Sequence, residues 1–244
     1  MLDDWLILLL PLFLIAALYG AVGHGGASGY LAIMALAATP ALVMKPTALS
    51  LNIAVSLVGT LLFFRAGHFA WRLFWPFAVA SIPLAYLGGG TAVTPQTFNI
   101  LLAVALSFAA LRLLWNPSDS ESLKQPALWA VLLLGASIGW FSGLIGVGGG
   151  IFLTPLLLIF RWADAKTAAA VSAPFIFVNS AAGLIGNRAH WQELPEVLPL
   201  LAVTVVAGGF LGARWGSGRA LNHQLKLALA LVLAIASAKL LLSL

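Results

Sequence analysis

Long uncharged apolar runs are the feature that most limits what this chain can fold into. Its 244 residues include only twelve Lys and Arg and seven Asp and Glu, and 62% of the residues are hydrophobic. A soluble domain carries roughly 25% charged residues, against 8% here. A helix needs about 20 mainly apolar residues to cross about 30 Å of hydrocarbon. Many of the runs between charges reach this length, so the sequence predicts an all-α integral membrane protein.

Charges and Pro/Gly breaks divide the apolar sequence into about ten predicted membrane segments. They are 5–22, 26–39, 47–64, 73–92, 97–115, 127–145, 150–162, 167–187, 196–213 and 221–243. Two of them, 26–39 and 150–162, are too short to cross the membrane as regular helix, and both follow glycine clusters. A polar linker at 116–126 separates a first membrane repeat, 1–115, from a second, 127–244.

The two halves match each other in sequence at an offset of 123 residues, which indicates an internal duplication. The matched pairs are Gly20 and Gly143, Gly23 and Gly146, Gly25 and Gly148, and Gly26 and Gly149. After a one-residue deletion the offset becomes 122, and Ser50 then matches Ser172. Apolar low-complexity sequence also aligns by chance, but the ordered glycines favour two homologous repeats.

The distribution of Lys and Arg tests how many segments cross, because positive charge gathers on the cytoplasmic side. Ten crossings place nine of the twelve basic residues on one side, whereas eight crossings place six on each. We therefore expect a 5+5 inverted repeat in the cytoplasmic membrane with both termini outside, and eight crossings as the alternative. Inverted halves are common among secondary transporters.

The glycine clusters are the strongest candidates for a functional site. Dense glycine unwinds a helix, which lipid tolerates only where the backbone is buried in protein or lines a cavity. A short helix that begins after such a break presents free amide donors to an anion. Close helix packing is the alternative reading, and we assign the four-residue repeat Gly135, Gly139 and Gly143 to packing. The predicted substrate contacts are Gly23, His24, Gly25, Gly26 and Ser28, with Gly146, Gly148, Gly149 and Gly150 in the second half.

These motifs resemble the sulfite exporter TauE/SafE family, also called the TSUP anion permeases. The resemblance covers nearly the whole chain and rests on 23–29, on GLIGVGGGIFLTP at 143–155, and on KTAAAVS at 166–172 with its counterpart KPTALS at 45–50. The first cluster departs from the second because His24 stands where Val147 does. The resemblance implies a secondary transporter, a permease or exporter, of sulfite, sulfonates or related sulfur anions, with no cofactor.

Polar residues on the following segments complete the predicted site. Ser50 and Ser172 match in the repeat, and the alternative role is helix capping or a bond to the carbonyl of the preceding turn. Asn52 and Asn179 are amides within apolar runs, where each needs a partner, either the ligand or another helix. His24 is the one ionisable group in the predicted cavity and is therefore a candidate for proton coupling, although a neutral, hydrogen-bonded histidine is the common case.

Other classes of function find little support. The chain has no cysteine, no H-E-x-x-H motif and few acids, so we predict neither a metal site nor an enzyme. Basic residues are scattered singly, which argues against nucleic-acid binding. The predicted partners are a small anionic substrate and the lipid bilayer, and a homo-oligomer remains open. An integral membrane accessory or scaffold protein without transport is the alternative function.

Overall fold

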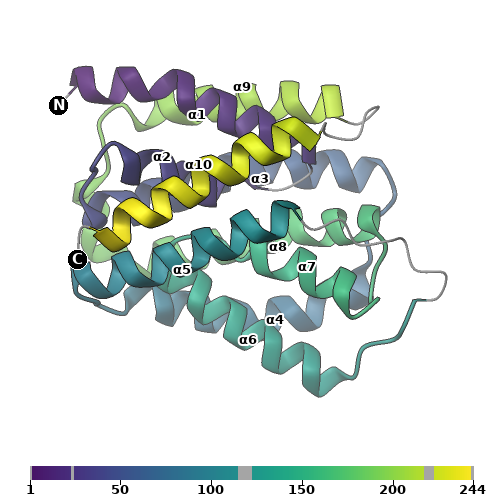
Figure 1. Cartoon of the computed structure of the whole chain (residues 1–244). Helices are drawn as coiled ribbons and strands as arrows, with labels where there is room; N and C mark the ends of the chain where they lie inside the picture. Colours follow the sequence, from purple (N-terminus) through teal and green to yellow (C-terminus); the bar gives the residue numbers. More distant parts are fainter. Residues whose placement is uncertain (1, 23–24, 115–122, 217–222, 243–244) are drawn as a thin grey trace.

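The computed structural model describes residues 2–22, 25–114, 123–216 and 223–242, and every regular element in these ranges is a helix (Figure 1). In chain order they are α1 (Leu2–Val22), α2 (Ala27–Leu36), α3 (Ala41–Arg65), α4 (Trp71–Gly90), α5 (Pro95–Leu114), α6 (Leu128–Ile145), α7 (Gly150–Ile159), α8 (Ala165–Gly186), the 3-10 helix η1 (Arg188–Glu193), α9 (Leu198–Gly216) and α10 (His223–Leu242).

Helix lengths confirm the predicted class of membrane protein. Within the described ranges, α3, α4, α5, α6 and α8 are long and apolar enough to cross a membrane. The helices α2 and α7 have ten residues each, which at 1.5 Å per residue reach only about half of the hydrocarbon thickness. The two short segments expected from the sequence are therefore present, each directly after its glycine cluster.

Helix α3 begins earlier than the sequence predicted. We expected its apolar segment to start at residue 47, because Lys45 was treated as a loop charge. The helix instead begins at Ala41, after the N-cap Pro40, and includes Lys45 and Pro46. Lys45 is only 7% exposed, and its ammonium donates to Gly89 O at 2.8 Å. A backbone partner thus lets the charge lie inside the helix bundle.

Small residues bring α6 and α4 into close backbone contact, as predicted for the four-residue glycine repeat. A Cβ atom placed on any of three α6 glycines would collide with, or press tightly against, the α4 backbone. The facing pairs, which repeat every four residues on both helices, are Gly135 with Phe77, Gly139 with Ser81 and Gly143 with Ala85. This spacing matches one face of each helix, so glycine is required for the packing.

The same kind of contact recurs between α1 and α9. A Cβ atom on Gly208 would meet the backbone of Phe13, and one on Gly212 would meet that of Ala17. The first helix of each half therefore packs on the fourth helix of the other half. Helix α3 likewise packs on α8, and α5 packs on α10. The hydroxyls of Ser107 on α5 and Ser237 on α10 share a hydrogen bond of 2.9 Å.

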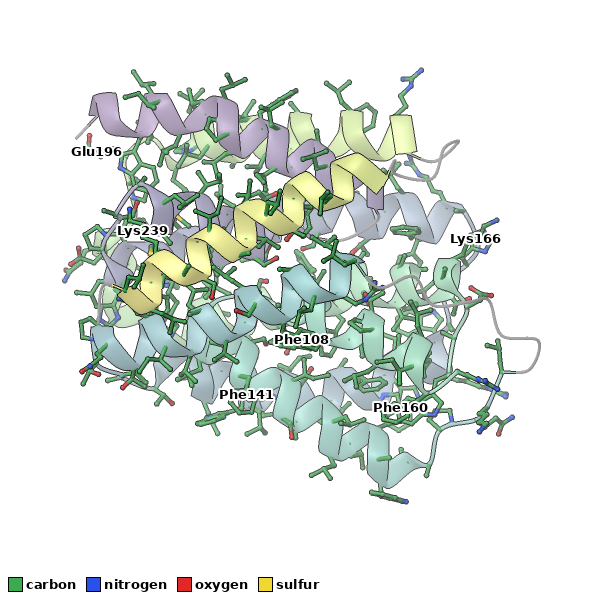
Figure 2. All side chains as sticks on the ribbon, viewed as in Figure 1. Phe108, Phe141, Phe160, Lys166, Glu196 and Lys239 are labelled. Atoms are coloured by element: carbon green, nitrogen blue, oxygen red, sulfur yellow. The ribbon has the colours of Figure 1, made fainter. Side chains whose placement is uncertain are left out.

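The outside of the bundle is apolar, and the charged side chains labelled in Figure 2 lie at its ends. Large hydrophobic side chains are well exposed along the outer helices, among them Ile7, Leu111, Leu133 and Val203. Figure 2 shows Lys166 at one end of the bundle and Lys239 and Glu196 at the other. An apolar belt between two charged ends fits a lipid bilayer. The chain is a multi-pass membrane protein.

Candidate functional site

The second glycine cluster forms a break between α6 and α7 that only glycine accommodates. Gly146, Gly148 and Gly149 have φ angles of 89°, 73° and 85°, in the left-handed region that L side chains rarely adopt. Gly146 ends α6 and Gly149 precedes α7. All four residues from Val147 to Gly150 are buried. The chain therefore leaves the helical conformation inside the protein, as the sequence predicted.

Two long helices, one from each half, hold this second break. A Cβ atom placed on Gly148 would lie 2.6 Å from Ser180 Oγ and 2.7 Å from Asn52 Nδ2. The Asn52 amide donates to Val147 O at 3.2 Å and lies 3.4 Å from Ser180 Oγ. Asn52 and Ser180 are fully buried. The break thus lies against α3 of the first half and α8 of the second.

The first glycine cluster forms the connection between α1 and α2. Gly23 and His24 lie outside the described residues, so their predicted roles stay predictions. A Cβ atom on Gly25 would lie 3.0 Å from Ile176 Cδ1 and 3.7 Å from Asn52 Oδ1. Asn52 and Ile176 also touch Gly148. The described part of the first break and the second break therefore lie against the same two side chains.

Both half-length helices begin at these breaks without a side-chain cap. Helix α2 follows Gly26 and α7 follows Gly149, and neither N-cap residue makes a side-chain capping hydrogen bond. The first amides of a helix lack partners within the helix, and its N-terminus carries a partial positive charge. Two such ends near one another are suited to an anion. Among the described residues, no group of three or more His, Cys, Asp or Glu side chains could hold a metal ion.

The predicted serines bond to protein groups rather than directly to the breaks. Ser28 shares a 2.6 Å hydrogen bond with Tyr19 Oη, which ties α2 to α1. Ser172 shares one of 2.8 Å with Thr154 Oγ1, which ties α8 to α7. Ser50 donates to Pro46 O at 2.9 Å within its own helix, the alternative role that the sequence left open. Ser28 and Ser172 thus position the half-helices.

The buried Asn179 lies on the face of α8 that contacts the second break. Its Nδ2 donates to Phe175 O at 2.8 Å. A Cβ atom on Gly149 would lie 2.8 Å from the Phe175 ring, and Gly150 would meet Ile176 in the same way. Residues three and four apart share a helix face, so Asn179 lies one turn along from these contacts. The structure brings it close to the predicted site, although its role in binding stays a prediction.

Sequence reasoning missed two residues at the first break. Ile176 touches both breaks, but an isoleucine in an apolar run gives no signal. Tyr30 is fully buried, and a Cβ atom on Gly26 would collide with its phenol ring. Its hydroxyl has no hydrogen-bond partner among the described residues. A signal did exist for Tyr30, because residues four apart share a helix face and Tyr30 follows Gly26 by four.

Lys45 is a third missed residue, close to the start of the second break. Its Nζ donates to Gly89 O at 2.8 Å and lies 3.4 Å from Gly88 O, at the C-terminal end of α4. A Cβ atom on Gly146 would lie 3.2 Å from Lys45 Cγ. The carbonyl end of a helix carries a partial negative charge that a cation stabilises. Lys45 therefore links α3, the end of α4 and the second break.

The fold is that of a polytopic helical membrane protein with two glycine-rich helix breaks, and the comparisons with known proteins identify the class as membrane transporters. A model of the sulfite exporter TauE/SafE family matches residues 8–240, and the chain belongs to this family. It is 39% identical over 239 residues to a probable membrane transporter protein of Sinorhizobium fredii, covering 96% of this chain and 97% of that one. No solved structure matches the chain.

Partial matches extend to more distant organisms. A probable membrane transporter protein of Methanocaldococcus jannaschii is 30% identical over 123 residues, which is 47% of this chain and 44% of the relative. One of Bacillus subtilis is 28% identical over 93 residues, or 36% of this chain and 30% of the relative. These names agree with transport.

Proposed function

We propose that this protein carries sulfite, sulfonates or related sulfur anions across the cytoplasmic membrane as a secondary transporter. The family name supports sulfur anions as the class of substrate. The substrate is held between the starts of α2 and α7, where uncapped helix N-termini supply amide donors and a partial positive charge.

One observation carries this proposal: both breaks touch Asn52 and Ile176. A scaffold protein has no need for irregular backbone from two distant parts of the chain at one buried place. Irregular backbone inside a membrane is costly unless protein or a ligand satisfies its polar groups. In this proposal the positive ends of the two helix starts bind one anion together.

The proposed mechanism is alternating access between inverted halves. The exchanged packing of α1 on α9 and of α6 on α4 supports a two-fold relation between 1–115 and 127–244. In Figure 1, α5 and α10 lie side by side and run in opposite directions, which supports inversion. Rocking of one half against the other would expose the same site to each side of the membrane in turn.

Flux measurements in proteoliposomes test the proposed site. We expect wild-type protein to release sulfite or a sulfonate down its gradient, and Gly25→Leu and Gly149→Leu to abolish this release. The matched control is Gly67→Ala, which replaces a left-handed glycine in a loop where a Cβ would meet nothing within 4 Å. Normal flux in both leucine variants would show that the site lies elsewhere. Absence of flux in the wild type would favour the accessory or scaffold role.

The orientation and the coupling proton are further parts of the proposal. The start of α1 and the end of α10 lie at the same end of the bundle (Figure 1), and the basic residues favour placing this end outside the cell. Reporter tags at the two termini should respond only to extracellular reagents.

His24→Gln should abolish pH-driven uptake and leave exchange intact if His24 carries the coupling proton. Unchanged pH dependence would remove that role.

A further inference from the structure

Two buried asparagine amides, Asn52 against the breaks and Asn179 one helical turn from the α8 residues that contact the second break, each have an oxygen without a hydrogen-bond partner among the described residues. Asn52 and Asn179 are both 0% exposed. Neither Oδ1 atom has a partner among the described residues. Buried acceptors of this kind are rare in native structures, because an amide oxygen taken out of water loses its hydrogen bonds. Each one calls for an explanation.

The neighbouring carbonyls fix the orientation of both amides. Asn52 Nδ2 donates to Val147 O, and Asn179 Nδ2 donates to Phe175 O. A backbone carbonyl can only accept a hydrogen bond. Turning either amide around would set two oxygens against each other, so the oxygens are the groups left free. The free atoms are therefore acceptors and not donors.

The free oxygen of Asn52 faces the first break. A Cβ atom on Gly25 would lie 3.7 Å from it, whereas the nitrogen of the same amide faces Gly148 in the second break. Tyr30, whose ring lies against Gly26, brings an unpartnered hydroxyl to the first break as well. The groups at the breaks thus include donors, from the helix starts and Tyr30, and one acceptor, Asn52 Oδ1, that only a donor can satisfy.

We propose that the site selects an anion that carries its own O–H or N–H donor. This inference rests on the proposed function, since it takes the breaks as the anion site. A fully deprotonated oxyanion would place its oxygens against amide oxygens, which repel it. A singly protonated oxyanion, or a sulfonate with a hydroxyl or ammonium group, offers the helix starts its negative oxygens and gives Asn52 or Asn179 a proton to accept.

Matched ligands test the proposal on the purified full-length protein in detergent. Ethanesulfonate and 2-hydroxyethanesulfonate have the same charge and differ by one hydroxyl group, and 2-aminoethanesulfonate supplies an N–H donor. We expect the hydroxy or amino compound to bind roughly tenfold more tightly than ethanesulfonate, the typical effect of one buried hydrogen bond. In the second arm, sulfite affinity is measured as pH rises, and it should fall as the protonated form is lost, with ethanesulfonate affinity unchanged.

The pattern of results separates the two sources of the donor. Preference for the hydroxy or amino sulfonate identifies a donor on the organic group, and pH-dependent sulfite binding identifies an acid O–H. Ethanesulfonate binding as tightly as both other sulfonates, together with pH-independent sulfite binding, would overturn the donor inference and leave the anion site standing. Failure of all these anions to bind would overturn the proposed function as well.

Variants connect the preference to the two amides. Asn179→Leu should reduce the preference for donor-bearing anions to within about twofold, and Asn52→Leu provides the second test. The control is Thr60→Val on α3, whose hydroxyl donates to Ser56 O within the helix, and it should keep the full preference. Retention of the preference in both leucine variants would show that neither amide accepts a hydrogen bond from the ligand.

Discussion

The two breaks share a composition but need glycine for different reasons. In the second, Gly146, Gly148 and Gly149 adopt left-handed backbone angles, so the backbone itself excludes other residues. In the first, no described glycine has a positive φ, and Gly26 precedes α2 at a φ of −83°. Glycine is needed there because Ile176 and Tyr30 occupy the space of a Cβ atom. Glycine is thus required by backbone conformation at the second break and by packing at the described part of the first.

This difference predicts how each half responds to substitution. A residue added where φ is positive strains the backbone whatever space surrounds it. A residue added against a side chain can be accommodated if that side chain moves. The second break should therefore tolerate less change than the first.

Gly148→Ala should have the largest effect. The left-handed angle costs about 1–3 kcal/mol for an L residue, and the methyl group would press on Ser180 and Asn52. We expect no measurable sulfite flux and a clear fall in melting temperature in detergent. Gly67→Ala carries the same backbone strain, at a φ of 74° in open space, and should keep transport. Full flux in Gly148→Ala would contradict the conformational account of the second break.

Lys45→Met should have the next largest effect, since it removes hydrogen bonds to the end of α4. A hydrogen bond to a charged group contributes about 1.5–3 kcal/mol, so the melting temperature should fall. The counterpart in the second half, Lys166, is exposed, and Lys166→Met should change stability by less than about 0.5 kcal/mol. Equal melting temperatures for the two variants would show that Lys45 stabilises the fold no more than Lys166 does.

Gly25→Ala should have a smaller effect, because the tightest contact of the methyl group would be with the movable end of Ile176, at 3.0 Å from Cδ1, and its contact with Asn52 Oδ1 at 3.7 Å is an ordinary one. We expect flux reduced a few-fold with little change in melting temperature. Ile176→Val removes the Cδ1 methyl group and should restore flux in the double variant. If the double variant transports no better than Gly25→Ala, the defect at the first break is not steric.

The smallest effect is expected from removing the side-chain cap at the start of α8, which has no equivalent at the start of α3. Asp164 caps α8 by accepting from Thr167 N at 2.7 Å, whereas Pro40 gives α3 no side-chain cap. The Thr167 N–H holds the pKa of Asp164 below its usual value. This stabilisation is present above the ordinary carboxyl pKa and is lost as pH falls below about 4.

Asp164→Ala should therefore cost about 1 kcal/mol at neutral pH and nothing in strong acid. Melting curves of the wild type and the variant between pH 7 and pH 3 check this expectation. A constant difference across the range would mean that the carboxylate charge does not stabilise the helix start.

Much of the fold could be predicted from the sequence, because membrane spans and glycine packing depend on local pattern. The short α2 and α7 follow from glycine clusters, and the contact of Gly135, Gly139 and Gly143 with α4 follows from their spacing. The start of α3 could not be predicted, since Lys45 finds its partners, Gly88 and Gly89, more than forty residues away.

The site was predicted less completely. Its glycines were found because they recur in both halves, and Asn52 because a polar group in an apolar run needs a partner. The hydrogen bond from Asn52 to Val147 O joins residues 95 apart in the sequence, and no pattern within one segment indicates it. Ile176 was missed because its importance comes only from its position between the two breaks.

That position of Ile176 has a mechanical consequence. Its branched side chain lies against both the segment before α2 and the start of α7. A rotation of α8 about its own axis would therefore change the packing at both places. The starts of α2 and α7 thus share one contact on α8, so a change in the Ile176 side chain alters the packing of both.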